Sequence, residues 1–170
     1  MKKVLIIDTS ILCVWLQVEG MDSCGPDNDR WTYARVHQKI TEEQEKGTTF
    51  ILPVATIIET GNHIAHAKGD RFGMAGRLTD KIIDATNATS PWAAFTEQKD
   101  LWDNDGLAAL AVRWKETAVG GQSLGDASIV DVANYYDKMG FAVEIFTGDA
   151  GLKAYQPPHK APERIPRRRK

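Results

Sequence analysis

The stretch that decides the fold is Lys3-Val4-Leu5-Ile6-Ile7-Asp8-Thr9-Ser10. Its four consecutive apolar residues predict a short strand that is buried on both faces, as in the centre of a parallel sheet. Asp8 follows directly, and Thr9 and Ser10 are suited to cap a helix that we expect to begin near Ile11. Asp8 therefore falls at the carboxyl end of a central strand, where open α/β sheets bind ligands. An aspartate that only caps the helix is the alternative at this position.

Two further strands are predicted, over 48–53 and 141–146. Helices are expected over 11–19 and 30–46, so the first third of the chain has the order β-α-α-β. Because parallel strands need crossover connections, this order predicts an α/β fold with a central, mainly parallel sheet. Residues 20–29 are rich in Asp, Gly, Pro and Asn and predict a loop.

Length and composition predict one globular domain. The chain has 170 residues, of which 42% are hydrophobic and 26% are charged. The amino-terminal apolar run stops at Asp8, which is too early for a signal peptide, and no run approaches the roughly 20 residues of a membrane helix. Cys13 and Cys24 show no metal-binding or disulfide pattern. These features predict a cytoplasmic protein with free thiols and no membrane segment.

The middle segment, residues 68–121, is predicted to be helical and is rich in Trp. Ser90 and Pro91 have the types expected at a helix start, with proline in the first helical position. The Trp residues favour packing against the sheet, with contact to a partner as the alternative. We expect one domain over 1–156 that includes this segment, followed by a separate tail over 157–170.

The tail is basic and rich in proline, which predicts an extended arm rather than a helix. Residues 159–170 contain six Lys/Arg and one Glu, whereas the whole chain has a net charge of −2. An extended basic arm can contact a nucleic-acid backbone. The alternatives are a tail that only aids solubility and a tail that folds back on the acidic body of the protein. The candidate nucleic-acid contacts are Arg164, Arg167, Arg168, Arg169 and Lys170.

Acidic residues recur at comparable places along the chain. Asp149 follows the third predicted strand, as Asp8 follows the first, while Glu59 and Asp126 lie near the starts of two helices. Four carboxylates at one edge of a parallel sheet would repel one another unless a cation neutralised them. Hard divalent ions with oxygen ligands fit this pattern, and two such ions can promote phosphodiester hydrolysis.

The helix expected over 55–67 places Glu59, Asn62, His63 and His66 on one face. A solvated face is the simpler interpretation of the two histidines. A zinc site made of Glu59, His63 and His66 is a second interpretation, although no further ligand stands at a suitable spacing.

These motifs, taken in order, resemble the PIN-domain nuclease family. The matching pieces are Val4–Ser10, the helix around Ile58-Glu59-Thr60, Ser123-Leu124-Gly125-Asp126, and Phe146-Thr147-Gly148-Asp149. The family includes bacterial and archaeal ribonucleases and the toxins of type II toxin–antitoxin systems. The middle segment is longer than in the toxins of that family.

The resemblance implies a three-layer α/β/α sandwich and Mg²⁺- or Mn²⁺-dependent hydrolysis of RNA by an endoribonuclease. The candidate partners are then an antitoxin or other regulatory protein and, in a homo-oligomer, further copies of this chain. By that pattern the catalytic and metal-binding residues are Asp8, Glu59, Asp126 and Asp149, with support from Thr9, Ser10, Asn62 and Thr147. Asp131 lies too far around its helix from Asp126 to replace it and is expected at the surface or behind the ligands.

Two other functions stay open. One is a catalytically silent PIN-like module that binds nucleic acid or protein through the tail and the Trp-rich segment. The other is a different aspartate-based α/β protein, such as a phospho-acceptor domain or a phosphatase of the haloacid-dehalogenase type. That class would need an aspartate two residues after Asp8, where this chain has Ser10.

Overall fold

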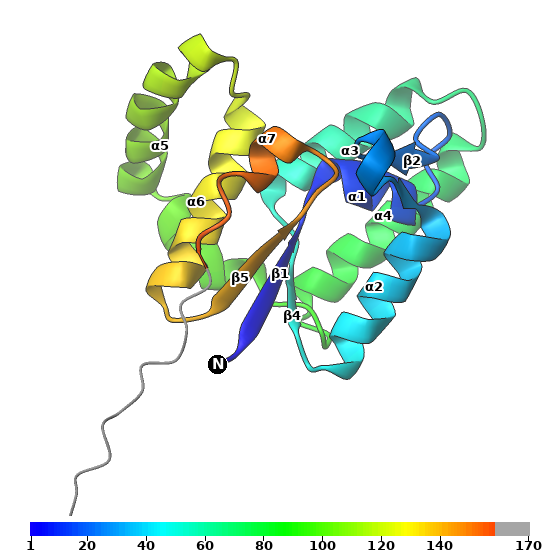
Figure 1. Ribbon diagram of the computed structural model, residues 1–170, viewed down its shortest axis with the longest axis horizontal. Coiled ribbons are helices and arrows are strands. Elements are labelled where there is room, and N and C mark those ends of the chain that lie inside the picture. Colours follow the sequence, from blue (N-terminus) through cyan, green and yellow to red (C-terminus); the bar gives the residue numbers. More distant parts are fainter. Residues whose placement is uncertain (159–170) are drawn as a thin grey trace, which may run out of the picture.

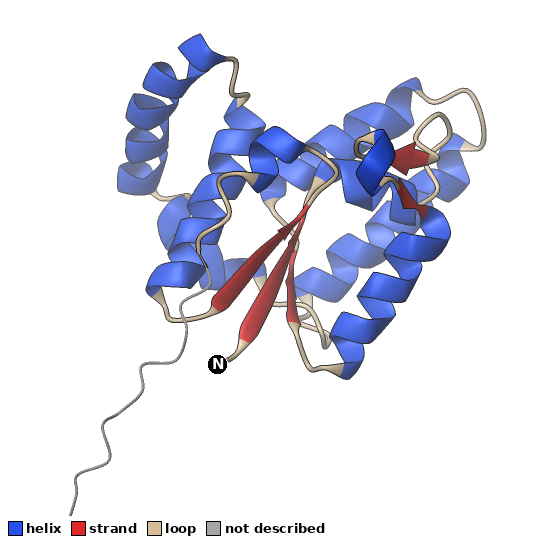
Figure 2. Ribbon diagram, in the orientation of Figure 1, coloured by secondary structure: helices blue, strands red, loops and turns tan. Residues whose placement is uncertain are grey.

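A three-stranded parallel sheet forms the centre of the computed structural model, which describes residues 1–158 (Figures 1 and 2). The strands are β1 (Lys3–Ile7), β4 (Thr49–Ile51) and β5 (Ala142–Phe146), in the order β4-β1-β5. Leu5 of the central strand lies opposite Phe50 of β4 and Glu144 of β5. The predicted strands and their parallel arrangement are therefore confirmed.

Helices cover both faces of this sheet (Figure 2). One face packs against the layer that contains α1, α2 and α4, and the other packs against α6. This arrangement is a three-layer α/β/α sandwich, as expected. The α-helices are α1 (Thr9–Trp15), α2 (Tyr33–Glu45), α3 (Val54–His66), α4 (Arg71–Thr86), α5 (Asn104–Thr117), α6 (Leu124–Lys138) and α7 (Ala150–Lys153), and the 3-10 helices are η1 (Asp27–Asp29), η2 (Phe95–Leu101) and η3 (Ala118–Gly120).

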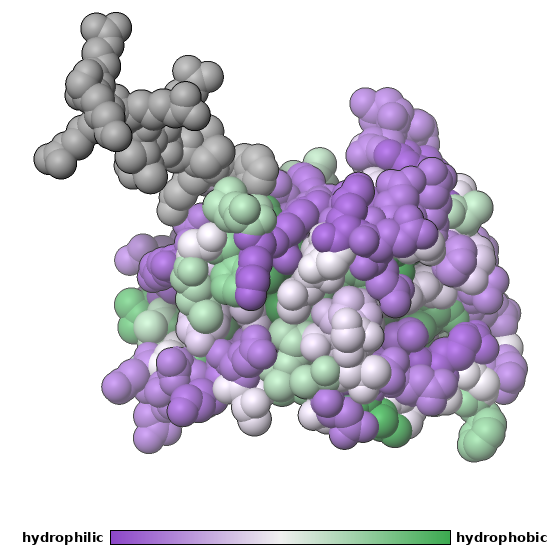
Figure 3. All heavy atoms as spheres, turned by 90° about the horizontal axis from the view of Figure 1, so that it is seen from below, coloured by the Kyte–Doolittle hydropathy of each residue, from purple (hydrophilic) through white to green (hydrophobic). Residues whose placement is uncertain are grey.

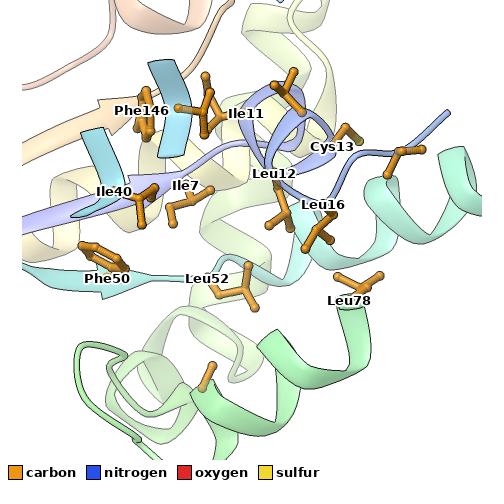
Figure 4. Packing of buried hydrophobic residues seen from close by; sticks show 14 of the residues in the cluster. Ile7, Ile11, Leu12, Cys13, Leu16, Ile40, Phe50, Leu52, Leu78 and Phe146 are labelled. Atoms are coloured by element: carbon orange, nitrogen blue, oxygen red, sulfur yellow. The ribbon is translucent and has the colours of Figure 1, made fainter. Parts of the chain in front are cut away.

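The central strand separates two hydrophobic cores because its side chains alternate between the faces of the sheet. Leu5 and Ile7 pack into the core beneath α1 and α4, part of which is shown in Figure 4. Val4 and Ile6 pack into the core beneath α6. All four are 0% exposed, and burial of each such side chain contributes about 1.5–3 kcal/mol. This double burial explains why β1 has no polar face.

The segment predicted as a loop over 20–29 also contains the first strand of a short antiparallel ribbon, and the second strand follows it. Strands β2 (Ser23–Cys24) and β3 (Trp31–Thr32) pair, and Gly25 turns the chain with φ of 89°. The helix expected from residue 30 consequently begins at Tyr33. Strands of two residues are too short to produce a recognisable alternation in the sequence, so the prediction missed them.

The predicted helix start at Ser90 and Pro91 is wrong. Across a cis Ser90–Pro91 peptide, the chain runs beside β4, where Phe50 N donates to Pro91 O (2.8 Å) and Ala93 N donates to Phe50 O (3.0 Å). Trp92 is 6% exposed, and its ring meets Phe50 edge-on and stacks on Trp15. Backbone groups of Pro91 and Ala93 are thus hydrogen-bonded to the edge strand β4 and not to neighbouring residues within a helix.

The rest of the middle segment is helical, as predicted, and α5 is its outermost part (Figure 1). Leu110 is the buried residue of α5, whereas Leu107 and Val112 are exposed. Within residues 1–158, none of the helices has the length and apolar character needed to cross a membrane. The face at the amino ends of the strands is largely hydrophilic (Figure 3).

Candidate active site

Asp8 lies at the carboxyl end of β1 and is 5% exposed. Its Oδ2 atom accepts hydrogen bonds from Ser10 N (3.3 Å), Ser10 Oγ (2.8 Å) and Thr147 Oγ1 (2.7 Å). The bond from Ser10 N makes Asp8 the cap of α1, so the helix begins at Thr9 rather than near Ile11. Asp8 therefore caps the helix, and its hydrogen bonds occupy only one carboxylate oxygen.

Asp149 has the equivalent place after β5. Its Oδ1 atom accepts from Gly151 N (2.7 Å) and Leu152 N (3.2 Å), which caps α7, and its side chain is exposed. The backbone N of Asp149 donates to Thr147 Oγ1 (2.9 Å). Because the same hydroxyl donates to Asp8, Thr147 joins the two strand-end aspartates through one buried atom.

Glu59 reaches the same edge from α3. Thr9 Oγ1 donates to Glu59 Oε2 (2.8 Å), and Thr9 is 7% exposed. The other oxygen, Oε1, lies against α6, since a Cβ atom built on Gly125 would stand 2.1 Å from it. A glycine at 125 therefore permits the close approach of α3 and α6 at this carboxylate.

Asp126 stands in the first turn of α6, where its backbone N donates to Ser123 Oγ (3.0 Å). Burial raises the pKa of Asp126, and the negative charges of Asp8, Asp149 and Glu59 raise it further, although a hydrogen bond to Ser123 lowers it. Asp126 and Asp149 also line one cavity, so these two acids face the same space.

The charge of this acidic group is not neutralised by neighbouring side chains. Among residues 1–158, no Lys, Arg or His forms an ion pair with any of the four carboxylates. Asp8, Glu59 and Asp149 each use one oxygen for the hydrogen bonds described above. This leaves the second oxygen of Asp8 and of Asp149 for a ligand, whereas the second oxygen of Glu59 lies against Gly125. Carboxylate oxygens with uncompensated charge fit a hard divalent cation chemically.

The spacing of these donors does not form a complete metal site. Within the described part of the chain, no three His, Cys, Asp or Glu side chains are grouped closely enough to hold a metal ion. This result also counts against the zinc interpretation of Glu59, His63 and His66, whose two histidines are exposed. The donor chemistry thus fits Mg²⁺ or Mn²⁺. Three or more of these side chains can coordinate one ion only if they come closer to one another.

The predicted supporting residues divide into two groups. Thr9, Ser10 and Thr147 all bond to the acids, and Ser10 Oγ also accepts from Gly148 N (3.0 Å). Asn62 is exposed, and its carbonyl oxygen lies 2.8 Å from His66 Nδ1 on the same helix. No hydrogen bond in residues 1–158 connects the Asn62 side chain to Glu59.

Two other predictions concern residues near the site. Asp131 forms an ion pair with Arg113 of α5, which agrees with its expected place away from Asp126. The basic residues Arg164, Arg167, Arg168, Arg169 and Lys170 lie outside the described residues.

The ribbon of β2 and β3 is a part of the site that the sequence did not reveal. A Cβ atom built on Gly148 would stand 2.7 Å from both Cys24 Sγ and Gly25 N, so the ribbon packs directly on the turn that precedes Asp149. Burial raises the pKa of the Cys24 thiol, a hydrogen bond to Ser10 lowers it, and the charge of Asp8 raises it. Cys13 and Cys24 are both free thiols, as predicted.

Between Asp126 and Asp149 the surface is hollowed into a cavity of about 200 Å³, which Gln122 and Tyr155 also line. No protein-family model, curated protein or solved structure matches this chain. The PIN-domain resemblance therefore rests on the residues and their order alone.

Proposed function

We propose that this protein is a metal-dependent nuclease that hydrolyses RNA, as its resemblance to PIN-domain nucleases implies. The observation that carries the proposal is that four carboxylates at one edge of the sheet have no cationic partner among residues 1–158, and that Thr147 joins two of them, Asp8 and Asp149. Groups that repel one another in this way destabilise a fold unless a ligand offsets the repulsion. A divalent cation supplies that offset and, when bound, polarises phosphate oxygens and lowers the pKa of water.

The roles of the chain's own residues follow from their contacts. Asp8, Glu59, Asp126 and Asp149 would hold the ion; Asp8 is buried, Glu59 and Asp126 are partly buried, and Asp149 is exposed. Thr147 and Ser10 fix the orientation of the Asp8 carboxylate, and Thr9 fixes that of Glu59. Fixed donors reduce the reorganisation needed when substrate and cation bind.

The direct test is cleavage of mixed RNA substrates by purified protein with Mg²⁺, with Mn²⁺ and with EDTA. Asp126→Asn should abolish the metal-dependent cleavage. Asp131→Asn is the matched control, because Asp131 lies on the same helix and is also partly buried but pairs with Arg113. Equal cleavage by wild type and Asp126→Asn would contradict the proposal.

A catalytically silent module that binds RNA is the second candidate function. It is favoured by the absence of three side chains grouped for metal binding in the part of the chain described. Titration with Mn²⁺ separates the two, because the nuclease should bind the ion through the carboxylates and lose affinity on Asp8→Asn. RNA binding without cleavage and without Mn²⁺ binding would favour the silent module.

A further inference from the structure

A second cavity adjoins the acidic edge and has a different lining. Its volume is about 330 Å³, and Trp31, Phe146 and Lys153 line it together with Thr147 and Asp149. The cavity therefore shares two residues with the candidate active site. It also presents the Trp31 ring, the Lys153 ammonium group and the carboxylates of Asp29 and Glu144, which are paired with Arg35 and with lysines, respectively. Its volume lies at the lower end of the roughly 300–1,000 Å³ of small-ligand sites, which suits a single nucleotide unit.

The ring of Trp31 is held in place from two sides. The Arg35 guanidinium lies 3.8 Å from the ring centroid, and Phe146 meets the ring edge-on at a centroid distance of 4.8 Å. Trp31 is only half-buried and contributes to the cavity wall. A fixed aromatic ring in a cavity loses little conformational freedom when a flat partner stacks on it.

Lys153 brings positive charge to the same cavity. Its Nζ donates to Ile145 O (2.7 Å) and lies 3.9 Å from the Glu144 carboxylate. That carboxylate is already paired with Lys3 at 2.6 Å and Lys39 at 3.2 Å. Among the described residues, this network joins four lysines to only two glutamates, and its members are Lys3, Lys39, Lys46 and Lys153 with Glu43 and Glu144.

The network therefore carries surplus positive charge, and Lys153 and Glu144 are its members that line the cavity. The Lys153 side chain is 44% exposed, so an anion in the cavity can approach it. Because the ammonium group has three N–H donors, it can contact a phosphate oxygen while it keeps its bond to Ile145 O and its ion pair with Glu144.

We propose that this cavity is a nucleotide subsite for single-stranded RNA, in which a base stacks on Trp31 and its phosphate binds Lys153. The next phosphodiester would then lie beside Thr147 and Asp149. Only an unpaired base can leave its neighbours to stack on a protein ring, so the subsite selects single-stranded over duplex RNA. This inference rests on the proposed function for the identity of the substrate.

Binding of a labelled RNA of about ten nucleotides, measured by fluorescence anisotropy, tests the subsite. The measurement uses the full chain carrying Asp126→Asn with EDTA, which prevents cleavage and removes one repelling charge. Trp31→Leu should weaken binding about ten-fold or more, whereas Trp31→Phe should stay within about three-fold of the parent. An abasic oligomer of the same length should bind Trp31→Leu and the parent equally.

Lys153→Gln should weaken binding and reduce the slope of log K against log salt by about 0.7, as expected for one phosphate contact on a single strand. Lys81→Gln is the matched control, because Lys81 also lies near a Trp ring, 4.9 Å from the centroid of Trp15, but outside this cavity. Lys81→Gln should leave both the affinity and the slope unchanged.

Unchanged RNA affinity of Trp31→Leu, in protein that unfolds at the temperature of Trp31→Phe, would overturn the subsite. The subsite would also be overturned if Trp31→Leu weakened binding of the abasic oligomer as much as binding of the ordinary RNA. Trp31-dependent binding without any cleavage by the wild type would support the subsite and contradict the nuclease. Cleavage that is abolished by Asp126→Asn but unchanged by Trp31→Leu would support the nuclease and contradict the subsite.

Discussion

At the scale of single residues, Thr147 links two of the candidate acids. Its hydroxyl donates to Asp8 Oδ2 (2.7 Å) and accepts from Asp149 N (2.9 Å). Thr147→Val keeps the shape of the side chain but removes the hydroxyl group that donates to Asp8 and accepts from Asp149 N. We therefore expect a loss of about 1–3 kcal/mol in unfolding free energy. RNA cleavage should fall at least ten-fold because Asp8 loses a fixed orientation. Thr147→Ser should restore both properties, and failure of that rescue would contradict the hydroxyl's role.

For Asp126 we expect that removal of the charge does not destabilise the protein, because this charge opposes folding in the absence of a cation. Burial and the neighbouring acids raise its pKa, so the ionised form is less favourable in the folded than in the unfolded protein. Asp126→Asn should therefore leave the melting temperature of the metal-free protein unchanged or raise it by up to a few degrees. A clear fall in melting temperature, measured by circular dichroism in EDTA, would contradict this interpretation.

Glu43, which lies away from the candidate site, makes the unfolding free energy depend on pH in the acid range. Burial would raise its pKa, but hydrogen bonds from Lys3, Thr48 and Lys39 outweigh burial and hold the pKa at about 2. Because the folded-state pKa is depressed, the stabilisation is complete above the unfolded value of 4.5 and is lost as the pH falls toward about 2.

Glu43→Gln should therefore cost about 2 kcal/mol at neutral pH, after allowance for screening at the partly exposed lysines. The difference between wild type and variant, measured by urea unfolding, should shrink between pH 4.5 and about 2. A difference that does not change with pH over this range would show that the charge of Glu43 is not its source.

At the scale of elements, the approach of α3 to α6 depends on one glycine. A methyl group on Gly125 would stand 2.1 Å from Glu59 Oε1, which is the end of a side chain and can move away. Gly125→Ala should thus displace the Glu59 carboxylate, lower cleavage at least ten-fold and change stability little. Gly76→Ala is the control, since nothing lies within 4 Å of the added methyl on α4. It should raise stability by up to about 1 kcal/mol with unchanged cleavage.

At the scale of the whole molecule, charge is distributed unevenly along the chain. Residues 1–158 contain 15 Lys/Arg and 22 Asp/Glu, whereas residues 159–170 carry a net charge of +5. A chain that ends at Pro158 should bind RNA more weakly and with a smaller salt dependence, because fewer counterions are released. Its melting temperature should stay unchanged. Equal affinity and equal salt slopes for the two chains would assign the tail another role.

The sequence by itself determined the parallel sheet and two of the acids at its edge. Each depends on neighbouring residues: the buried run of Val4 to Ile7 makes β1, and Asp8 and Asp149 directly follow their strands. Local apolar runs specify strands because both faces of this sheet are buried. The middle helices and the cap of α6 at Ser123 are local in the same sense.

Only the tertiary structure decided how the acids are held and what lies beside them. Thr147 bonds to Asp8 across 139 positions of sequence, and Thr9 bonds to Glu59 across 50. The strand-like segment around Trp92, the glycine at 125 and the cavity beside Trp31 likewise depend on contacts between distant segments. Such contacts leave no periodic pattern in either partner, because each is fixed by the packing of whole elements rather than by local conformational preference.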